Sequence, residues 1–333
     1  MKPFKALRVH QADKGTLARL DTITLDALSP GEVVIRVAYS GINYKDALAV
    51  TGRGRITRGS PRVAGIDLSG TVEFSSDAHY RAGDRVLVTG CNIGESLDGG
   101  FAEFARVPAA AVVPLPAGLN LFEAMALGTA GFTAAMALRR MLENHQSPDL
   151  GPIAITGPTG GVGSIAIQLF KRAGFEVCAI TGKAGAADDY LHALGADSII
   201  DRRSLELGGK PLESARWGGA VDNLGGEVLS YLTRTTRPWG NIACIGLAAS
   251  PALDTTVMPL ILRGVSLLGI HSVECPRAWR LAIWDRLSYE WKPRGLDSLI
   301  APRVLALEDV PAQCEQLVAG SATARTVVRL AGD

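Results

Sequence analysis

The stretch TGPTGGVG occupies residues 156–163, directly after the apolar run PIAI at 152–155 and directly before the amphipathic pattern SIAIQLFK at 164–171. A strand, a glycine turn and a helix in this order form the phosphate-binding turn of a dinucleotide site. The pyrophosphate must approach backbone amides at a helix N-terminus, and side chains at the glycines would hold it away. The alternative is chance spacing of glycines. Apolar runs at 175–180 and 196–201 argue against chance because they extend the pattern to β-α-β-α-β.

The tip of the second predicted strand indicates which dinucleotide is bound. NAD sites usually place Asp or Glu there, whereas this chain has Thr181, Gly182 and Lys183. A hydroxyl, a free amide and an ammonium suit a 2′-phosphate, and Arg202 after the third strand could add a guanidinium. We therefore predict NADPH as the cofactor. The alternative is that Lys183 and Arg202 are ordinary solvated charges.

The composition is that of a globular chain in a reducing compartment. With a net charge of +1, nothing suggests a nucleic-acid partner bound through gross basicity. The five cysteines include no Cys-x-x-Cys pair, so neither a disulfide framework nor a zinc knuckle is encoded. The N-terminus lacks a signal-peptide core, and we see no unbroken apolar span of membrane length. We expect a cytoplasmic protein without a membrane partner.

Periodicity divides the chain into two kinds of segment. Up to about residue 116 the runs at 31–40, 70–74 and 84–89 read as strands between turns, and from 123 to 138 the pattern becomes helical. The tail at 324–330 is β-like again, and we expect it to rejoin the first domain. The predicted domains are residues 1–122 with 300–333, and residues 123–299.

The central α/β segment continues with two strand-then-glycine units, at 219–225 and 240–246, and ends with the apolar run 266–270. This last run should be the edge strand of the cofactor sheet. An apolar edge strand is usually paired or covered, so pairing with a second copy would give a homodimer. A covering helix is the alternative.

Five blocks carry a family resemblance that extends over essentially the whole chain. They are residues 41–48 (GINYKDAL), 65–72 (GIDLSGTV), 99–103 (GGFAE), 128–134 (GTAGFTA) and 255–263 (TTVMPLILR). The chain resembles the medium-chain dehydrogenase/reductase superfamily, and these blocks are similar to the acryloyl-CoA reductase branch of its quinone-oxidoreductase-like enzymes. The resemblance implies an α/β fold, with a GroES-like β-rich catalytic domain and a Rossmann domain whose doubly wound parallel sheet binds the cofactor.

The positions of the family's zinc ligands hold other residues here. Zinc-dependent relatives carry a Cys-His pair and an Asp in the first block, where this chain has Asn43, Tyr44 and Asp46. Their Gly-His-Glu in the second block reads Gly-Ile-Asp at 65–67. Since thiolate and imidazole are both missing, we predict that no metal is bound and that zinc does not act as a Lewis acid.

Without a metal, hydrogen bonds must polarise the substrate. The resemblance implies hydride transfer from NADPH to the β carbon of an enoyl thioester, with protonation of the α carbon and an enolate-like oxygen to be stabilised. Tyr44 could donate to that oxygen or deliver the proton. Alternatively, its hydroxyl only braces the cofactor. Asn43 and Asp46 could orient Tyr44, or they could be local turn caps.

The glycine turn and the resemblance together predict the residues that contact the cofactor. They are Tyr44, Thr129, Thr133, Thr159, Gly160, Gly161, Val162, Gly163, Thr181, Gly182, Lys183, Arg202, Leu247, Ile270, Ser272 and Arg325. For Arg325 the family's arginine before the last strand implies an ion pair with a phosphate of the dinucleotide or of coenzyme A.

A glycine-rich loop gives one clue to the substrate. It carries Arg53, Arg55, Arg58 and Arg62, whose guanidinium groups could bind the phosphates of an acyl-CoA. A solvated basic loop is the alternative. The segments at 90–98, 237–240 and 319–321 depart from the branch.

Three functions therefore remain open on the sequence. The first is an NADPH-dependent acryloyl-CoA-type reductase, and the second is a reductase of quinones or free enones. The third is a non-catalytic NADPH-binding sensor or structural protein, because a fold does not entail its chemistry.

Overall fold

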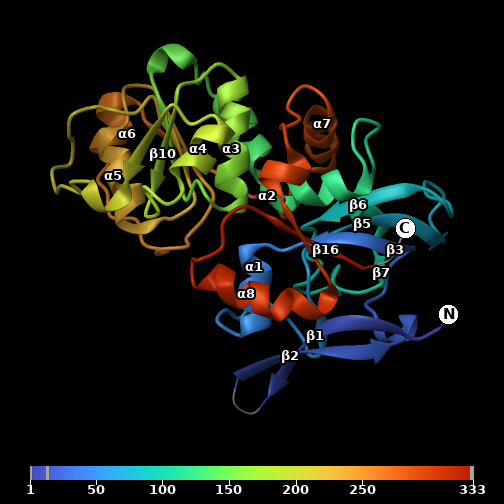
Figure 1. Cartoon of the computed structure of the whole chain (residues 1–333). Helices are drawn as coiled ribbons and strands as arrows, with labels where there is room; N and C mark the ends of the chain where they lie inside the picture. The colour runs from blue at the N-terminus through green and yellow to red at the C-terminus, as the bar shows by residue number, and fades with distance from the viewer. Residues whose placement is uncertain (1, 13–14, 331–333) are drawn as a thin grey trace. The chain divides into compact units, whose positions relative to one another are not determined.

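The computed structural model describes residues 2–12 and 15–330 (Figure 1). By its internal contacts the chain divides into two compact units. Unit 2 comprises Ala130–Ser272 and Glu290–Arg294, and unit 1 comprises the other described residues. Compared with the predicted boundaries at 122/123 and 299/300, unit 1 extends to Thr129 and also takes in Val273–Tyr289.

Helix α7 (Arg277–Ser288) explains the second difference. The Arg277 guanidinium donates to the Ala110 and Val112 carbonyls of unit 1, at 2.9 Å each. Arg280, which is buried, donates to the Thr89 carbonyl at 2.7 Å. These contacts join residues that lie far apart in the sequence, and local pattern does not show them. The predicted boundary at 299/300 therefore placed α7 in the cofactor domain.

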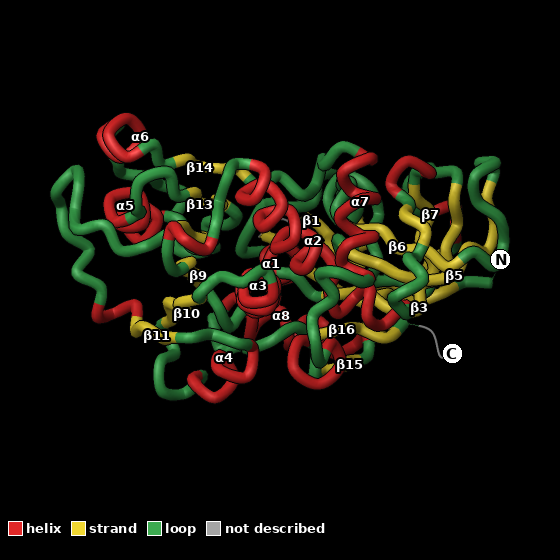
Figure 2. Tube along the Cα trace, turned by 90° about the horizontal axis from the view of Figure 1, so that it is seen from above, coloured by secondary structure: helices red, strands yellow, loops and turns green. Residues whose placement is uncertain are grey.

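Unit 2 is built on a six-stranded parallel sheet in the order β11-β10-β9-β12-β13-β14. Its strands are β9 (Ile153–Thr156), β10 (Val177–Thr181), β11 (Ser198–Asp201), β12 (Gly219–Asp222), β13 (Asn241–Cys244) and β14 (Ser266–Gly269). Its helices are α3 (Gly161–Arg172), α4 (Asp188–Leu194), α5 (Gly226–Thr235) and α6 (Met258–Arg263). Figure 2 shows α3 and α4 on one face of the sheet and α5 and α6 on the other.

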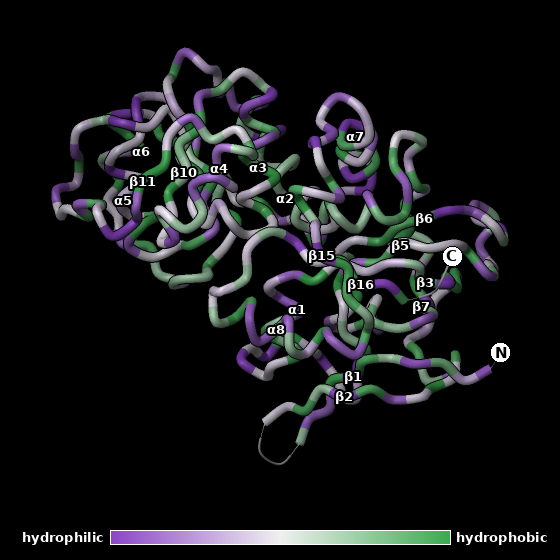
Figure 3. The backbone as a smooth tube through the Cα atoms, in the orientation of Figure 1, coloured by the Kyte–Doolittle hydropathy of each residue, from purple (hydrophilic) through white to green (hydrophobic). Residues whose placement is uncertain are grey.

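This strand order is that of the doubly wound dinucleotide fold. The middle strands are apolar because helices cover both faces, and Figure 3 shows green tube around β10 between purple loops. The order of the sheet reverses between β9 and β12, and such a switch point opens a crevice at the carboxyl ends of the strands.

Unit 1 is mostly antiparallel β-structure. One sheet has the order β2-β1-β4, and a seven-stranded sheet has the order β15-β16-β3-β5-β6-β8, with β7 pairing to β3. The strands are β1 (Phe4–Ala12), β2 (Gly15–Ile23), β3 (Val33–Gly41), β4 (Arg62–Val63), β5 (Asp67–Ser75), β6 (Arg85–Thr89), β7 (Phe104–Val107), β8 (Val113–Pro114), β15 (Arg303–Leu305) and β16 (Thr326–Arg329). Besides α7, the unit contains α1 (Tyr44–Thr51) and α8 (Val310–Val318). The predicted return of the C-terminal strand is confirmed, because Val327 of β16 pairs with Gly41 of β3.

Helix α2 (Leu121–Glu143) begins in unit 1 and continues in unit 2. Among the described residues it is long and apolar enough to span a membrane, which corrects the expectation that no such segment occurs. However, 78% of its most apolar window is buried inside the protein, and Gly128 breaks the helix with a φ of 51°. We therefore interpret α2 as a kinked core helix.

Candidate functional site

The turn between β9 and α3 is a cradle made of backbone. Gly157 has a φ of 57°, which favours glycine, and Gly160 is the N-cap of α3. A Cβ on Gly163 would lie 2.4 Å from the Gly157 carbonyl oxygen, so only glycine lets the helix pack this closely on the turn. The N-terminal amides of α3 follow directly on this glycine turn, and such an arrangement fits a pyrophosphate.

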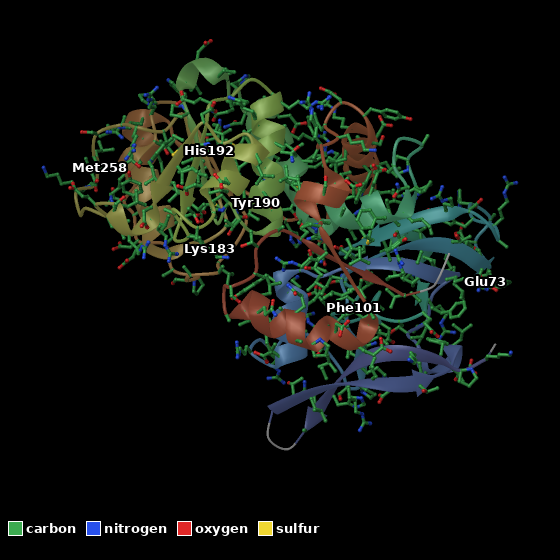
Figure 4. All side chains as sticks on the ribbon, viewed as in Figure 1. Glu73, Phe101, Lys183, Tyr190, His192 and Met258 are labelled. Carbon is green, nitrogen blue, oxygen red and sulfur yellow. The ribbon has the colours of Figure 1, made fainter. Side chains whose placement is uncertain are left out.

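The ends of β10 and β11 bring together the four residues that the sequence assigned to a 2′-phosphate. Thr181 pairs with Asp201 in the parallel register, so both strands end at the same edge of the sheet. The Thr181 hydroxyl accepts a hydrogen bond from the Lys183 N–H at 3.1 Å. A Cβ on Gly182 would lie 3.7 Å from the Arg202 guanidinium, which places that side chain beside the turn. Figure 4 labels Lys183 at this edge of the sheet.

The Asp201 carboxylate lies at the same edge, and it is paired with the Arg203 guanidinium. The guanidinium donates to both carboxylate oxygens, at 3.0 and 2.7 Å, and this pairing lowers the pKa of Asp201. At this edge Arg203 therefore pairs with the Asp201 carboxylate, while Thr181, Lys183 and Arg202 add a hydroxyl and two cationic groups. Such a set fits a 2′-phosphate better than a pair of ribose hydroxyls.

A hydrogen-bonded group at the switch point was not singled out from the sequence. The Thr156 hydroxyl donates to the buried Asp222 carboxylate at 2.8 Å and accepts from the Asn223 N–H at 2.9 Å. Burial raises the pKa of Asp222. The available signal was the Asp222-Asn223 pair at a strand end, followed after one residue by the glycines at 225 and 226.

The remaining cofactor residues predicted in unit 2 lie at several places. Thr159 is buried and Val162 partly buried around the β9–α3 turn, while Thr133 is buried in α2. Leu247 is exposed after β13. Ile270 and Ser272 follow β14. Their roles as cofactor contacts stay predictions.

Tyr44 is the first residue of α1 in unit 1. The residue is 38% exposed, and among the described residues its hydroxyl has no hydrogen-bond partner. The geometry leaves that hydroxyl available to a ligand.

Asp46 has the geometry of a cap. Its Oδ2 accepts from the Asn43 N–H at 2.8 Å, and its Oδ1 accepts from the Ile66 N–H at 2.9 Å. Burial, followed by the charge of Asp67, raises the pKa of Asp46 to about 7. Because the carboxylate is buried and both its oxygens are occupied by backbone donors, the geometry favours the capping role over direct chemistry.

Arg325 lies inside unit 1, where only 3% of it is exposed. Its guanidinium donates to the Asn43 Oδ1 at 3.1 Å and to the Met125 carbonyl at 3.2 Å, and it lies 3.7 Å from the Asp67 carboxylate. The sequence predicted a phosphate as its partner. In the structure the partners are protein groups, because the buried Asp67 carboxylate needs a cation.

Thr129 also contacts Asp67. Its hydroxyl donates to Asp67 Oδ1 at 2.5 Å and its N–H donates to Oδ2 at 2.9 Å. Burial raises the pKa of Asp67, opposed by Arg325 and by these hydrogen bonds. Asp67 belongs to the second resemblance block, but the sequence gave it no role of its own.

The glycine-rich loop that carries Arg53, Arg55, Arg58 and Arg62, called the arginine loop from here on, is only partly available to a ligand. Arg53 pairs with Glu315 at 2.9 Å, with both side chains exposed. Arg62 is held by Ser29 and Asp98, at 2.6 and 3.2 Å. The exposed side chains of Arg55 and Arg58 have no hydrogen-bond or ion-pair partner among the described residues.

No group of three or more His, Cys, Asp or Glu side chains that could hold a metal ion occurs within residues 2–12 and 15–330. The positions where zinc-dependent relatives carry ligands form the network of Asn43, Asp46 and Asp67 described above.

Known proteins similar to this chain extend over its whole length. A family model for the alcohol dehydrogenase GroES-like domain matches residues 29–117, and a model for zinc-binding dehydrogenases matches residues 161–288. The acrylyl-CoA reductase AcuI of Ruegeria pomeroyi is 41% identical over 98% of this chain and 98% of its own. The putative quinone oxidoreductase YhfP of Bacillus subtilis is 42% identical over 98% of this chain and 99% of its own.

Two crystal structures are close in fold as well as in sequence. The structure of YhfP with NAD bound has a TM-score of 0.95 and covers 99% of this chain and 100% of its own. The yhdH oxidoreductase of Salmonella enterica in complex with NADP also has a TM-score of 0.95, at 39% identity, and covers 98% of this chain and 100% of its own. The two relatives thus contain different dinucleotides.

Proposed function

This chain belongs to the medium-chain dehydrogenase/reductase superfamily, and from that premise we propose that it catalyses the NADPH-dependent reduction of the C=C bond of an α,β-unsaturated acyl thioester of the acryloyl-CoA type. The observation that carries the substrate class is the full-length similarity to a protein named acrylyl-CoA reductase.

The donor set at the ends of β10 and β11 supports NADPH as the cofactor. Thr181, Lys183 and Arg202 would hold the 2′-phosphate, and the α3 N-terminus would hold the pyrophosphate. When bound, NADPH supplies the hydride for the β carbon of the substrate. The structure of YhfP holds NAD, so the distinction between the two dinucleotides in this chain rests on these three side chains.

The protein's part in the chemistry is to stabilise the developing enolate oxygen and to supply a proton. The Tyr44 hydroxyl, which has no partner among the described residues, donates a hydrogen bond to that oxygen or a proton to the α carbon. Asn43 and Asp46 position Tyr44 through the start of α1. The replacement of the Cys-His pair by Asn43 and Tyr44 supports a reaction without metal.

Arg55 and Arg58 are the candidate residues for the phosphates of coenzyme A, because Arg53 and Arg62 already have protein partners. This narrows the sequence prediction, which included Arg53 as an equal member. The phosphates of an acyl-CoA would accept charge-assisted hydrogen bonds from the two guanidinium groups, whereas a small enone has no phosphate to accept them.

A comparison of three substrates tests the proposed function. NADPH oxidation is measured with acryloyl-CoA, a simple enone and a quinone, for the wild type and for Tyr44→Phe. We expect acryloyl-CoA to give the highest kcat/KM, and the variant to lose about 10²-fold or more in kcat. A preference for the quinone would favour the second candidate function, which the 42% identity to a putative quinone oxidoreductase supports. NADPH binding without turnover of any of the three substrates would favour a non-catalytic NADPH-binding sensor or structural protein.

We further propose that the protein is a cytoplasmic homodimer. Strand β14 is an edge of the six-stranded sheet, and the preceding α6 exposes Met258, Ile261 and Leu262 (Figure 4 labels Met258). Apolar side chains beside a free strand edge are commonly covered by a second copy. Light scattering should give twice the chain mass for the wild type and a smaller mass for Ile261→Asp with Leu262→Asp. A monomeric wild type would contradict the dimer.

A further inference from the structure

Asn43 is the residue before Tyr44, and both polar atoms of its side chain amide are hydrogen-bonded. Its Nδ2 donates to Asp67 Oδ2 at 2.8 Å, and its Oδ1 accepts from the Arg325 guanidinium at 3.1 Å. The backbone N–H of Asn43 donates to Asp46 at 2.8 Å. The Tyr44 hydroxyl has no hydrogen-bond partner among the described residues, so the placement of this side chain depends on Asn43 and on the start of α1.

The Asp67–Arg325 pair needs space that only glycine leaves at two neighbouring positions. A Cβ on Gly128 would lie 2.4 Å from the Asp67 carboxylate, and a Cβ on Gly41 would lie 2.5 Å from the Arg325 guanidinium. Two glycines therefore make room for the pair, one of them at a left-handed φ of 51° inside a helix. The Arg325 Nε is buried without a hydrogen-bond partner.

Such a pair is a poor way to stabilise a fold. Desolvating two charges cancels much of their attraction, and apolar side chains of similar volume commonly do as well. Backbone strain and buried charge are more often retained where they hold a functional group in place. Asp67 contacts three separate segments, through Asn43, Thr129 and Arg325, and the first of these leads directly to Tyr44.

We propose that Asp67 and Arg325 are positioning residues that fix the side chain of Asn43 and thereby the orientation of Tyr44. The inference rests on the proposed function, because the effect is read in reduction of an activated C=C bond. It assigns Arg325 a role inside the protein instead of at a phosphate.

A double-mutant cycle between Asp67→Asn and Tyr44→Phe tests this inference. The rates are measured with NADPH and a small enone, which avoids any contribution of the arginine loop. We expect Asp67→Asn to lower kcat about 10²-fold, the loss that a misplacement of about 1 Å produces, with little change in KM. In the Tyr44→Phe background the same substitution should lower kcat by less than about threefold. The effects of two substitutions are not additive when one residue acts through the other.

Two measurements that do not depend on turnover accompany the cycle. The NADPH Kd, from fluorescence titration, should stay within about threefold of wild type, since unit 2 carries the phosphate site. Hydrogen exchange of the peptide at residues 42–48, measured without cofactor, should become faster in Asp67→Asn. The matched control is Asp98→Asn, which alters another buried carboxylate paired with an arginine in unit 1. It should leave kcat and exchange at 42–48 unchanged.

Three outcomes would overturn the inference. They are an unchanged kcat in Asp67→Asn, a full loss repeated in the Tyr44→Phe background, or a Tyr44→Phe variant as active as wild type. If wild type reduces neither acryloyl-CoA nor the small enone, the proposed function fails first and the inference falls with it; if it reduces acryloyl-CoA alone, the same cycle is measured with acryloyl-CoA, so the two failures are distinguishable.

Should Asp67→Asn fail to fold, the paired variant Asp67→Leu with Arg325→Met removes both charges and leaves neither unpaired. We expect it to melt within a few degrees of wild type and to show the same loss of kcat. A folded paired variant with wild-type kcat would contradict the inference.

Discussion

Two alanine substitutions in one turn separate packing from cofactor binding. A Cβ on Gly163 would lie 2.4 Å from the Gly157 carbonyl oxygen, and since real Cβ atoms stay beyond 3.0 Å, α3 must move by about 0.6 Å. Overpacking of this kind costs about 1–3 kcal/mol. A domain of this size loses about 2–4 °C in Tm per kcal/mol, so Gly163→Ala should melt roughly 2–12 °C lower without cofactor.

Gly160→Ala is the matched control in the same turn. A Cβ there would lie 3.4 Å from the Gly157 carbonyl oxygen, an ordinary contact, and Gly160 has an extended φ of −83° that any residue adopts. Its Tm without cofactor should therefore stay near that of wild type. Its NADPH affinity should still fall, because the added methyl group lies at the N-terminus of α3 where the pyrophosphate approaches.

The assay is differential scanning fluorimetry of both variants without and with NADPH, supported by fluorescence titration of the cofactor. Bound cofactor should raise the Tm of wild type and raise that of both variants less. Equal melting of the two variants without cofactor would refute the packing argument. Wild-type NADPH affinity in Gly160→Ala would refute the assignment of the turn to a pyrophosphate.

Three further predictions concern charge. Lys183→Ala with Arg202→Ala should weaken NADPH binding by about 10- to 100-fold per lost charge-assisted bond and leave NADH binding nearly unchanged, as measured by titration of both dinucleotides. Arg55→Ala with Arg58→Ala should raise KM for an acyl-CoA about tenfold or more without altering KM for a small enone. Because burial raises the pKa of Asp46 from 3.8 to about 7, folding favours its protonated form, and its contribution to stability is lost as the pH rises from about 4 to 7. Thermal melts across this range should therefore show a steeper fall for wild type than for Asp46→Asn.

The parts of the fold that the sequence predicted well are local. A glycine turn between a strand and a helix depends on residues within a few positions of one another, so the β9–α3 turn could be located from spacing alone. The cluster at the ends of β10 and β11 was predictable for a related reason. Parallel neighbours in a doubly wound sheet end at one edge, which brings Thr181 and Arg202 together.

The parts that the sequence did not predict depend on distant partners. Arg325 and Asn43 are 282 positions apart, and nothing in the local pattern of either shows that they meet. The arginine loop likewise looked uniform, yet Glu315 and Asp98 pair with two of its members and leave the others available. Local pattern identifies elements and turns, whereas the ionisation and availability of a side chain depend on what the fold places beside it.

Reduction of acryloyl-CoA by NADPH deuterated at the reactive position of the nicotinamide is the most direct test of the central claim. The product, analysed by mass spectrometry and NMR, should be the saturated acyl-CoA with one deuterium on the β carbon and a hydrogen from water on the α carbon. Absence of the saturated thioester, or a saturated product without deuterium on the β carbon, would contradict the proposed function.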